Sequence, residues 1–204
     1  MNDIPGWFAY KHTTTMQHED AVDKFRELIK QTKPSQILEI GTAQGGLTLA
    51  LLDLLAECDL PNTTLRTYDI HERNLHELVE TIENGANGEI FVKNIFNDNY
   101  DALEEVEEIQ SYIQRPGCTL VLCDGGSKIR EFNILSPYLK EGDIIMAHDY
   151  APNEQYFLEY NKDKVWNWLE IQDCDITEAV KLHNLEPFMQ DEFIKVVWVC
   201  KIKK

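Results

Sequence analysis

An acid and three glycines early in the chain have the spacing of a ligand-binding loop. The segment Gln36–Thr48 is typical of a short apolar strand, a glycine turn and a helix that opens at Gly45 and Gly46. Such a turn leaves backbone N–H groups free at the positive end of a helix, and glycine has no Cβ to keep a ligand away. The spacing is Glu-x-Gly-x-x-x-Gly, beginning at Glu39 and Gly41. It differs from the Gly-x-Gly-x-x-Gly turn that holds a dinucleotide pyrophosphate.

A second acid follows at a suitable distance. The segment Leu65–Ile70 has the pattern of a strand that ends in the carboxylate of Asp69. A carboxylate at that place can accept hydrogen bonds from both hydroxyls of a ribose. Loop and acid together predict a nucleoside ligand without a pyrophosphate, and S-adenosylmethionine fits that description. The alternative for the glycines is an ordinary tight turn between a strand and a helix.

Two later strands end in groups that can do chemistry. The strand Thr119–Asp124 ends in Asp124, and the strand Ile144–Ala147 delivers His148 and Asp149. Ligands of open α/β sheets bind outside the carboxyl ends of the strands, so these side chains should meet at one edge. The alternative is that the two acids simply cap helices or turns.

These groups require a sheet with helices on both sides. Apolar residues recur at helical spacing in residues 18–31, 46–57, 75–82, 103–113 and 129–139. Short apolar strands lie between them, and Phe193–Ile202 is predicted as the last strand. A cap is expected at Asp175 with Glu178 three residues on, and Trp7–Thr15 is expected to be a loop or cover. This alternation predicts a single Rossmann-like α/β domain over residues 1–204, with a doubly wound, mostly parallel seven-stranded sheet.

The chain resembles a known family at several of these places. The segments Leu38–Thr48, Tyr68–Ile70, Leu122–Gly126 and Tyr138–Asp149 recur in this order in class I methyltransferases. Within that class the chain is most similar to the cephalosporin-hydroxylase-like and macrolide-sugar O-methyltransferase group, and more distantly to catechol O-methyltransferase. The resemblance covers roughly residues 16–150. It implies S-adenosylmethionine as the cofactor and a hydroxyl of a small molecule as the acceptor, with a sugar or natural-product precursor favoured.

The resemblance also implies roles for single residues. It places Asn94 near the adenine, although Asn94 is equally well explained as a turn residue. Residues 1–17, including Gln17 and His18, would form an N-terminal lid. The full set expected to bind the cofactor is Glu39, Gly41, Thr42, Gly45, Gly46, Asp69, Ile70, Asn94 and Asp124.

A divalent metal is a further implication of the resemblance. In that group an acid ending strand four and two adjacent residues ending strand five hold the ion; here these are Asp124, His148 and Asp149. His148 departs from the pattern, which usually has an oxygen donor there, and it would favour Mn, Fe or Zn over Mg. A bound cation would stabilise the alkoxide of the acceptor. A metal-free version would need a base, for which His148 and Lys128 are the candidates.

Charge and composition narrow the possible partners. The chain of 204 residues has 19 basic and 36 acidic residues, a formal charge of −17. Such a field repels phosphate backbones and anionic membranes, so neither nucleic acid nor a membrane is expected as a partner. No apolar run approaches the roughly 18 residues of a membrane span, and no secretory signal is apparent. The five cysteines form no Cys-x-x-Cys pair, so we expect a reducing, cytoplasmic location; a homo-oligomer stays possible.

Two other functions fit the same fold. A nicotinamide-dependent oxidoreductase shares the sheet and the acid after the second strand, but the missing Gly-x-Gly-x-x-Gly turn argues against it. A nucleoside-binding protein without catalytic activity is the second alternative.

Overall fold

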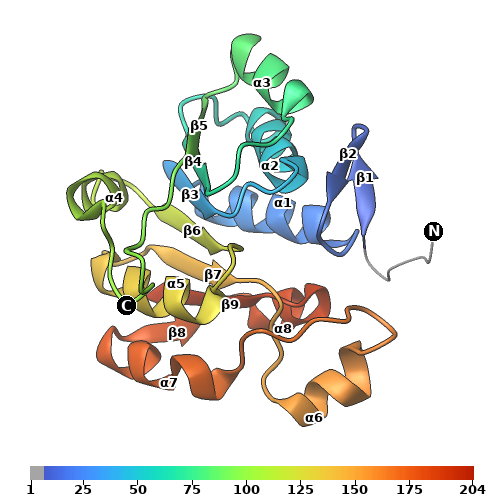
Figure 1. Cartoon of the computed structure of the whole chain (residues 1–204), viewed down its shortest axis with the longest axis vertical. Coiled ribbons are helices and arrows are strands. Elements are labelled where there is room, and N and C mark those ends of the chain that lie inside the picture. Colours follow the sequence, from blue (N-terminus) through green and yellow to red (C-terminus); the bar gives the residue numbers. More distant parts are fainter. Residues whose placement is uncertain (1–6) are drawn as a thin grey trace.

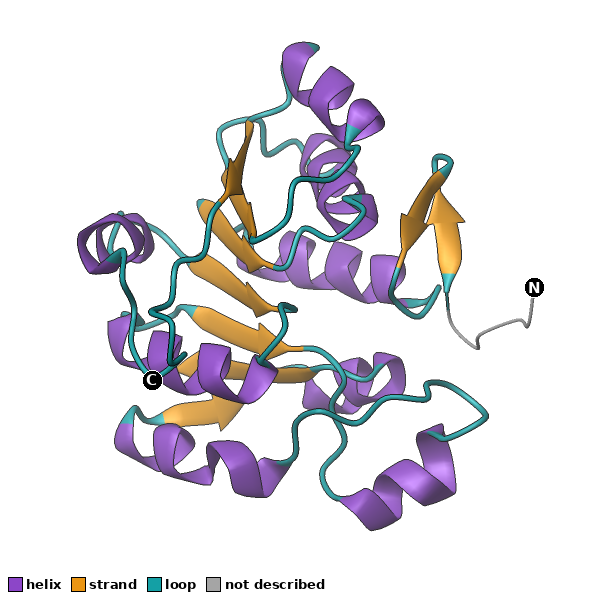
Figure 2. Ribbon diagram, in the orientation of Figure 1, coloured by secondary structure: helices purple, strands orange, loops and turns teal. Residues whose placement is uncertain are grey.

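The computed structural model describes residues 7–204, and within this range seven strands form one sheet (Figures 1 and 2). The order across the sheet is β5-β4-β3-β6-β7-β9-β8. The first five strands of this order are parallel, and β9 runs antiparallel to both of its neighbours. The predicted doubly wound, mostly parallel sheet is therefore confirmed. The strands are β3 (Gln36–Ile40), β4 (Thr64–Asp69), β5 (Gly88–Val92), β6 (Thr119–Cys123), β7 (Ile144–Ala147), β8 (Leu185–Pro187) and β9 (Val199–Lys203).

Helices cover both faces of the sheet. Side chains of β3 alternate, so Ile37 packs into one core while Leu38 and Ile40 pack into the other. All five residues of β3 are buried, as expected of a parallel strand between two neighbours and two layers of helices. The Ile37 face carries α1 (Ala21–Thr32), α2 (Gly46–Glu57), α3 (His76–Glu83) and α8 (Gln190–Phe193), and the Leu38 face carries α4 (Val106–Ile113), α5 (Lys128–Leu135) and α7 (Asp173–Leu182).

Several predicted bounds agree with the structure to the residue. The strand Gln36–Ile40, the helix Gly46–Glu57 and the strand Ile144–Ala147 are found as predicted. The helix predicted over residues 129–139 is shorter, because Pro137 lies in a 3₁₀ turn, Ser136–Tyr138, that follows α5.

The C-terminal part departs most from the predictions. The predicted last strand over Phe193–Ile202 is wrong in its first half, which contains the end of α8 and a 3₁₀ turn, Ile194–Val196. Val197 takes a left-handed conformation (φ 58°) and turns the chain into β9. The predicted cap at Asp175 is also displaced: Gln172 is the N-cap of α7, and Asp175 is the acid that closes its capping box. Before α7, the short α6 (Glu154–Tyr156) continues into a π-helical turn, Phe157–Asn161.

The segment before α1 contains a hairpin that the sequence did not predict. Strands β1 (Phe8–Tyr10) and β2 (Thr13–Thr15) pair antiparallel and contact α2. A Cβ on Gly46 would clash with Thr15 and the Thr14 carbonyl, so this glycine lets the hairpin pack on the start of α2. Residues 1–6 of the predicted lid over residues 1–17 lie outside the described residues. None of the helices in residues 7–204 is long and apolar enough to cross a membrane.

Candidate active site

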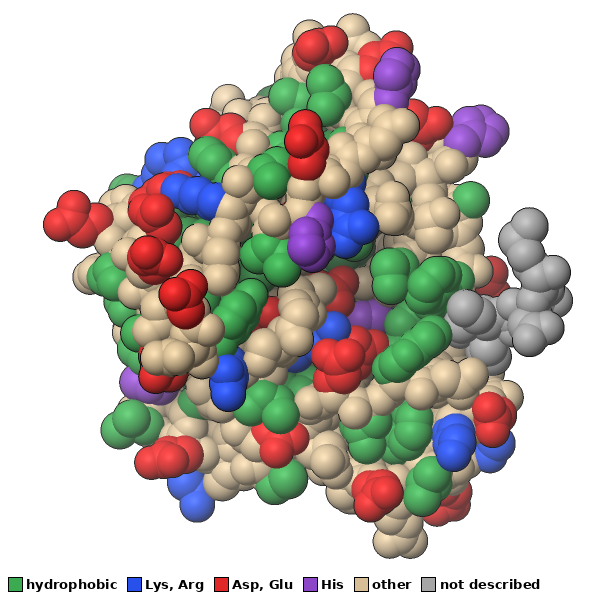
Figure 3. Space-filling model, viewed as in Figure 1, with side chains coloured by type: hydrophobic (Ala, Val, Ile, Leu, Met, Phe, Trp, Pro, Cys, Tyr) green, Lys and Arg blue, Asp and Glu red, His purple; other side chains and the backbone are tan. Residues whose placement is uncertain are grey.

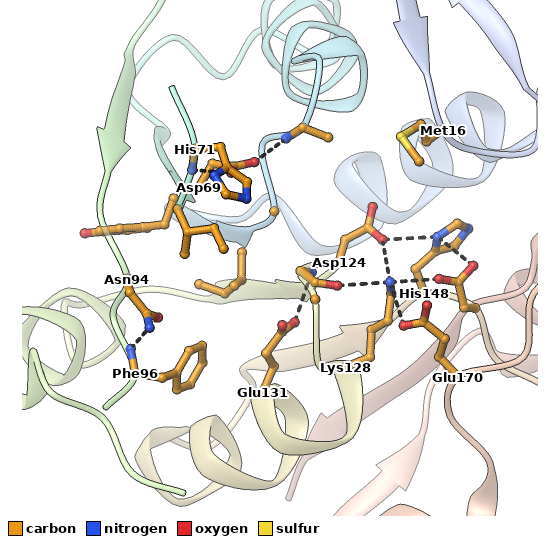
Figure 4. A pocket seen from close by; sticks show the side chains of 18 of the residues that line it. Met16, Asp69, His71, Asn94, Phe96, Asp124, Lys128, Glu131, His148 and Glu170 are labelled. Atoms are coloured by element: carbon orange, nitrogen blue, oxygen red, sulfur yellow. Dashed lines mark hydrogen bonds and ion pairs between the residues drawn. The ribbon is translucent and has the colours of Figure 1, made fainter. Parts of the chain in front are cut away.

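A cavity of about 370 Å³ lies at the carboxyl ends of the central strands. This volume falls within the range of small-molecule sites. In Figure 3 the surface is hollowed here, and acidic, basic and histidine side chains meet beside a hydrophobic patch. Figure 4 shows two groups of side chains facing each other. We call Gly41, Ala43, Asp69, Asn94 and Phe96 the β3–β4 wall, and Asp124, Lys128, His148, Asp149 and Glu170 the β6–β7 wall.

Asp69 braces the β3–β4 wall through two backbone groups. Its carboxylate accepts a hydrogen bond from the Ala43 N–H and another from the His71 N–H, both at 2.8 Å. The loop after β3 and the loop after β4 are thus joined at the rim of the cavity. Each carboxylate oxygen keeps further lone pairs for a ligand hydroxyl.

Gly41 joins the two walls. It has a φ of +97°, and a Cβ at this position would clash with the backbone carbonyl of Asp124 at the end of β6. Without a side chain, the ends of β3 and β6 can approach each other closely.

Some of the residues predicted to bind the cofactor lie behind the loop. Glu39 is fully buried and accepts a hydrogen bond from Thr48 Oγ1 at 2.6 Å, and burial raises its pKa to about 7. Thr42 Oγ1 lies 2.6 Å from Thr67 Oγ1. Gly45 (φ +80°) packs under Leu75 and Leu78, and Gly46 packs under the hairpin. The predicted residues that line the cavity are Gly41, Asp69, Ile70, Asn94 and Asp124.

Asn94 closes a turn at the edge of the cavity, as the turn interpretation predicts, and its contact with an adenine stays a prediction. Its side-chain oxygen accepts a hydrogen bond from the Phe96 N–H at 3.1 Å, which closes a turn, and Asn94 also lines the cavity. The Phe96 ring stacks on Tyr100 with 5.1 Å between centroids, and both residues line the same part of the cavity.

The β6–β7 wall brings the three predicted metal ligands together. One ligand atom from each of Asp124, His148 and Asp149 lies within 4.8 Å of the others. His148 Nδ1 is 3.1 Å from Asp124 Oδ1 and 3.5 Å from Asp149 Oδ1. Burial alone would lower the pKa of His148, but the carboxylates of Asp149 and Asp124 outweigh burial and raise it. Burial would raise the pKa of Asp149, yet His148 and Lys128 hold it below its usual value.

Lys128 lies inside this cluster. Its ammonium is 2.8 Å from Asp149 Oδ2, 3.0 Å from Glu170 Oε2 and 4.0 Å from Asp124 Oδ1. It also donates to the Gly125 carbonyl at 3.0 Å. Burial would lower the pKa of Lys128, but Asp124 and Asp149 outweigh burial and hold it above its usual value.

Four residues of the site were missed or only partly anticipated. Gln17, expected as part of a lid, donates to Asp124 Oδ2 at 2.6 Å and accepts from Trp198 Nε1 at 2.9 Å. Trp166 donates its indole N–H to Asp149 Oδ1. Glu170 lies in no strand or helix pattern, so no feature of the sequence predicted its place in the site.

Glu131 holds the loop after β6 through hydrogen bonds to its backbone. Its carboxylate accepts hydrogen bonds from the Gly125 N–H at 3.0 Å and the Ser127 N–H at 2.9 Å. Burial raises its pKa to about 7. The signal in the sequence was weak: an acid in the first turn of a helix, four residues after a serine.

The β6–β7 wall already holds a positive charge where the predicted divalent cation would bind. Lys128 Nζ lies 2.8 Å from Asp149 Oδ2 and 4.0 Å from Asp124 Oδ1. A cation added beside this ammonium would be repelled at short range. The expected metal stays a prediction that this geometry argues against.

Comparisons with known proteins agree with the cavity and the fold. A family model described as a methyltransferase domain matches residues 38–150, more than half of the chain. The chain belongs to this methyltransferase family. The match contains the glycine loop, Asp69, Asp124 and the His148–Asp149 pair. A search of curated protein sequences finds no match.

Solved structures share the fold of this methyltransferase at low sequence identity. An apo structure of a CmcI N160 form has a TM-score of 0.64 at 12% identity, covering 97% of this chain and 77% of that chain. A structure described as CmcI D160 with Mg and S-adenosylmethionine has a TM-score of 0.62 at 13% identity, covering 96% and 76%. An O-methyltransferase family protein from Burkholderia thailandensis has a TM-score of 0.59 at 12% identity, covering 91% and 56%. These likenesses establish the class I methyltransferase fold.

Proposed function

We propose that this methyltransferase uses S-adenosylmethionine to methylate a hydroxyl of a small molecule, with a sugar or natural-product precursor as the acceptor class. The observation that carries the proposal is the cavity itself. It connects a wall braced by Asp69, suited to a nucleoside, with a wall of charged groups suited to a proton transfer. The S-adenosylmethionine in one similar structure and the O-methyltransferase family of another support the same assignment.

On the β3–β4 wall, the cofactor's ribose is assigned to Asp69. The Ala43 and His71 N–H groups fix this carboxylate, so it meets the two ribose hydroxyls without reorganising. The adenine is assigned to the region lined by Asn94, Phe96 and Tyr100, where aromatic rings offer apolar contact.

On the β6–β7 wall, the acceptor hydroxyl is assigned to Asp124. Bound S-adenosylmethionine would supply an electrophilic methyl group to the acceptor oxygen, and the electron pair of the broken C–S bond would leave with the sulfur of the neutral thioether product. The hydroxyl proton passes to the Asp124–His148 pair, in which Asp124 lies at the cavity wall and His148 Nδ1 stands 3.1 Å from its Oδ1. Positioned proton acceptors of this kind contribute about 10²–10⁴ in rate.

Of the two versions left open by the sequence, the metal-free one has more support. The Lys128 ammonium already pairs with Asp149 and faces Asp124, the two carboxylates that a divalent cation would need. Of the two candidate bases, Lys128 has less support than His148. Its ammonium faces three acceptors, Asp149, Glu170 and the Gly125 carbonyl, which hold it protonated.

Calorimetry with S-adenosylmethionine, S-adenosylhomocysteine and NAD tests the cofactor assignment. We expect binding of the first two and none of NAD. Binding of NAD alone would favour the oxidoreductase and end the proposal.

Transfer of a labelled methyl group to a library of sugar, phenol and alcohol acceptors tests the reaction. We expect label in hydroxyl-bearing products, and a chelator should leave the rate unchanged. Tight cofactor binding without transfer to any acceptor would instead favour a non-catalytic binding protein.

A further inference from the structure

The environment of the Lys128 ammonium is that of a bound cation. Three acceptors surround its three protons: Asp149 Oδ2 at 2.8 Å, Glu170 Oε2 at 3.0 Å and the Gly125 carbonyl at 3.0 Å. The Lys128 side chain is 9% exposed, so the charge is held away from bulk water. A buried charge of this kind is stable only when it is paired.

This ammonium lies beside the predicted metal cluster. Lys128 Nζ contacts Asp149 and lies 4.0 Å from Asp124 Oδ1, so two of the three predicted metal ligands are its neighbours. Figure 4 shows the ammonium among the carboxylates of Asp124 and Glu170 with His148 beside them. A divalent ion placed here would be repelled by the Lys128 ammonium at short range.

We propose that the Lys128 ammonium is the resident cation of this site and takes the place of the divalent metal that the sequence suggests. The role of Lys128 in catalysis rests on the proposed function, which this inference deepens. Lys128 neutralises Asp124 and Asp149, so that an acceptor oxygen can approach them while it loses its proton.

Glu170 is the partner of Lys128 that an acceptor can replace. The Glu170 side chain is 43% exposed, whereas that of Asp149 is 8% exposed. When Glu170 turns toward solvent, one N–H of Lys128 becomes free to donate to the acceptor oxygen. Lys128 is therefore a built-in positive charge at the reacting oxygen and not the base of the reaction.

Metal binding by the chelator-treated full chain tests this inference directly. MnCl₂ is titrated into wild type and followed by calorimetry and by the electron paramagnetic resonance of free Mn²⁺. We expect no saturable site in wild type and no change of its melting temperature with MnCl₂. One Mn²⁺ bound per wild-type chain would overturn the inference whatever the variants do.

Removing the ammonium should create the metal site. Lys128→Ala leaves Asp124, Asp149 and Glu170 without their cation, so the variant should gain one Mn²⁺ site, with an affinity more than about tenfold above that of wild type. Lys128→Met is the second variant, for use if Lys128→Ala does not fold. It retains most of the packing of the lysine side chain and should gain the same Mn²⁺ site. A folded variant that gains no Mn²⁺ affinity would contradict the inference, and if neither folds the wild-type titration decides.

Lys140→Ala is the matched control. Lys140 Nζ lies 2.6 Å from the buried Asp143, close to the amino end of β7, and its removal also leaves a carboxylate unpaired. This variant should gain no Mn²⁺ site, since Asp143 lies outside the cluster of predicted metal ligands. Binding of S-adenosylmethionine is measured separately, so failure of the proposed function would be seen there and not in the Mn²⁺ titration.

Discussion

The acidic side chains of the two cavity walls have different kinds of hydrogen-bonding partners. On the β3–β4 wall, Asp69 accepts hydrogen bonds from backbone N–H groups. On the β6–β7 wall, Asp124 and Asp149 are satisfied by side chains, including a histidine and a lysine. Backbone donors hold a fixed geometry and suit the binding of a constant ligand. Coupled side chains can move a proton and a charge together, which suits a reaction. Under the proposed function, binding and chemistry are divided between the walls.

Substituting His148 should give the largest effect and test this division. His148→Asn removes the ring behind Asp124, so kcat should fall by about 100-fold or more, as for the loss of a positioned proton acceptor. The dissociation constant of S-adenosylmethionine should change by less than about threefold. Methyl transfer and calorimetry on the same preparation measure the two. A large loss of cofactor affinity would show that the walls do not act separately.

Gly41→Ala should break the contact between the walls. The new Cβ would clash with the Asp124 carbonyl at a φ of +97°, so we expect a loss of about 3 kcal/mol in the free energy of unfolding. Gly85→Ala is the control, because Gly85 has a φ of +107° and, among the described residues other than its chain neighbours, none has an atom within 4 Å of its Cβ position. It should lose about 1–2 kcal/mol from the backbone conformation alone. Equal losses in urea denaturation would contradict the close approach of β3 and β6.

Asp69→Asn should weaken cofactor binding and spare the chemistry. The asparagine amide has one acceptor oxygen where the carboxylate has two, so it can no longer accept hydrogen bonds on both sides. S-adenosylmethionine should therefore bind about 10- to 30-fold more weakly, a loss of about 1.4–2 kcal/mol in binding free energy. The kcat at saturating cofactor should stay within about threefold. Asp191→Asn, an exposed position on α8, is the control for a lost charge. Unchanged affinity for Asp69→Asn would refute its assignment to the ribose.

The buried acids Glu39 and Glu131 should affect the stability of the fold and its dependence on pH. Burial raises the pKa of both Glu39 and Glu131 to about 7, above the ordinary 4.5. Each therefore stabilises the fold fully below pH 4.5, and this contribution is lost as the pH rises through 7. Glu39→Gln should raise the free energy of unfolding at pH 8 by about 1–3 kcal/mol and flatten its change from pH 5 to pH 8.

Glu131→Gln should not show that gain. The Glu131 carboxylate accepts from two backbone N–H groups, and the amide would lose one of these bonds at about 1–3 kcal/mol. Glu178→Gln, on the exposed face of α7, is the control. Urea denaturation at both pH values measures all three variants, and equal behaviour of the Glu39 and Glu131 variants would contradict the contacts of Glu131.

Local patterns were enough to predict the half of the fold around the β3–β4 wall. The apolar run of β3, the glycine turn and the helix α2 follow one another directly. The hydrophobic periodicity of these elements and the glycines that separate them therefore lie in one short segment. The strand ends also predicted that Asp124, His148 and Asp149 would meet, because parallel strands end at one edge.

The rest depends on contacts between distant segments. Gln17 meets Asp124 across 107 positions, and Trp198 meets Gln17 across 181. No local period encodes such pairs. The wrong prediction of the last strand has the same cause. Phe193 packs against Phe25 of α1, and a buried apolar residue of this kind is compatible with a helix as well as with a strand.

The hydrogen bonds from Trp198 to Gln17 and from Gln17 to Asp124 have a consequence for the order of assembly. During synthesis, the glycine turn and Asp69 emerge long before Trp198 does. The β3–β4 wall can therefore begin to form early, while the carboxylate of Asp124 acquires its final orientation only when Trp198 arrives. The β6–β7 wall is thus completed last.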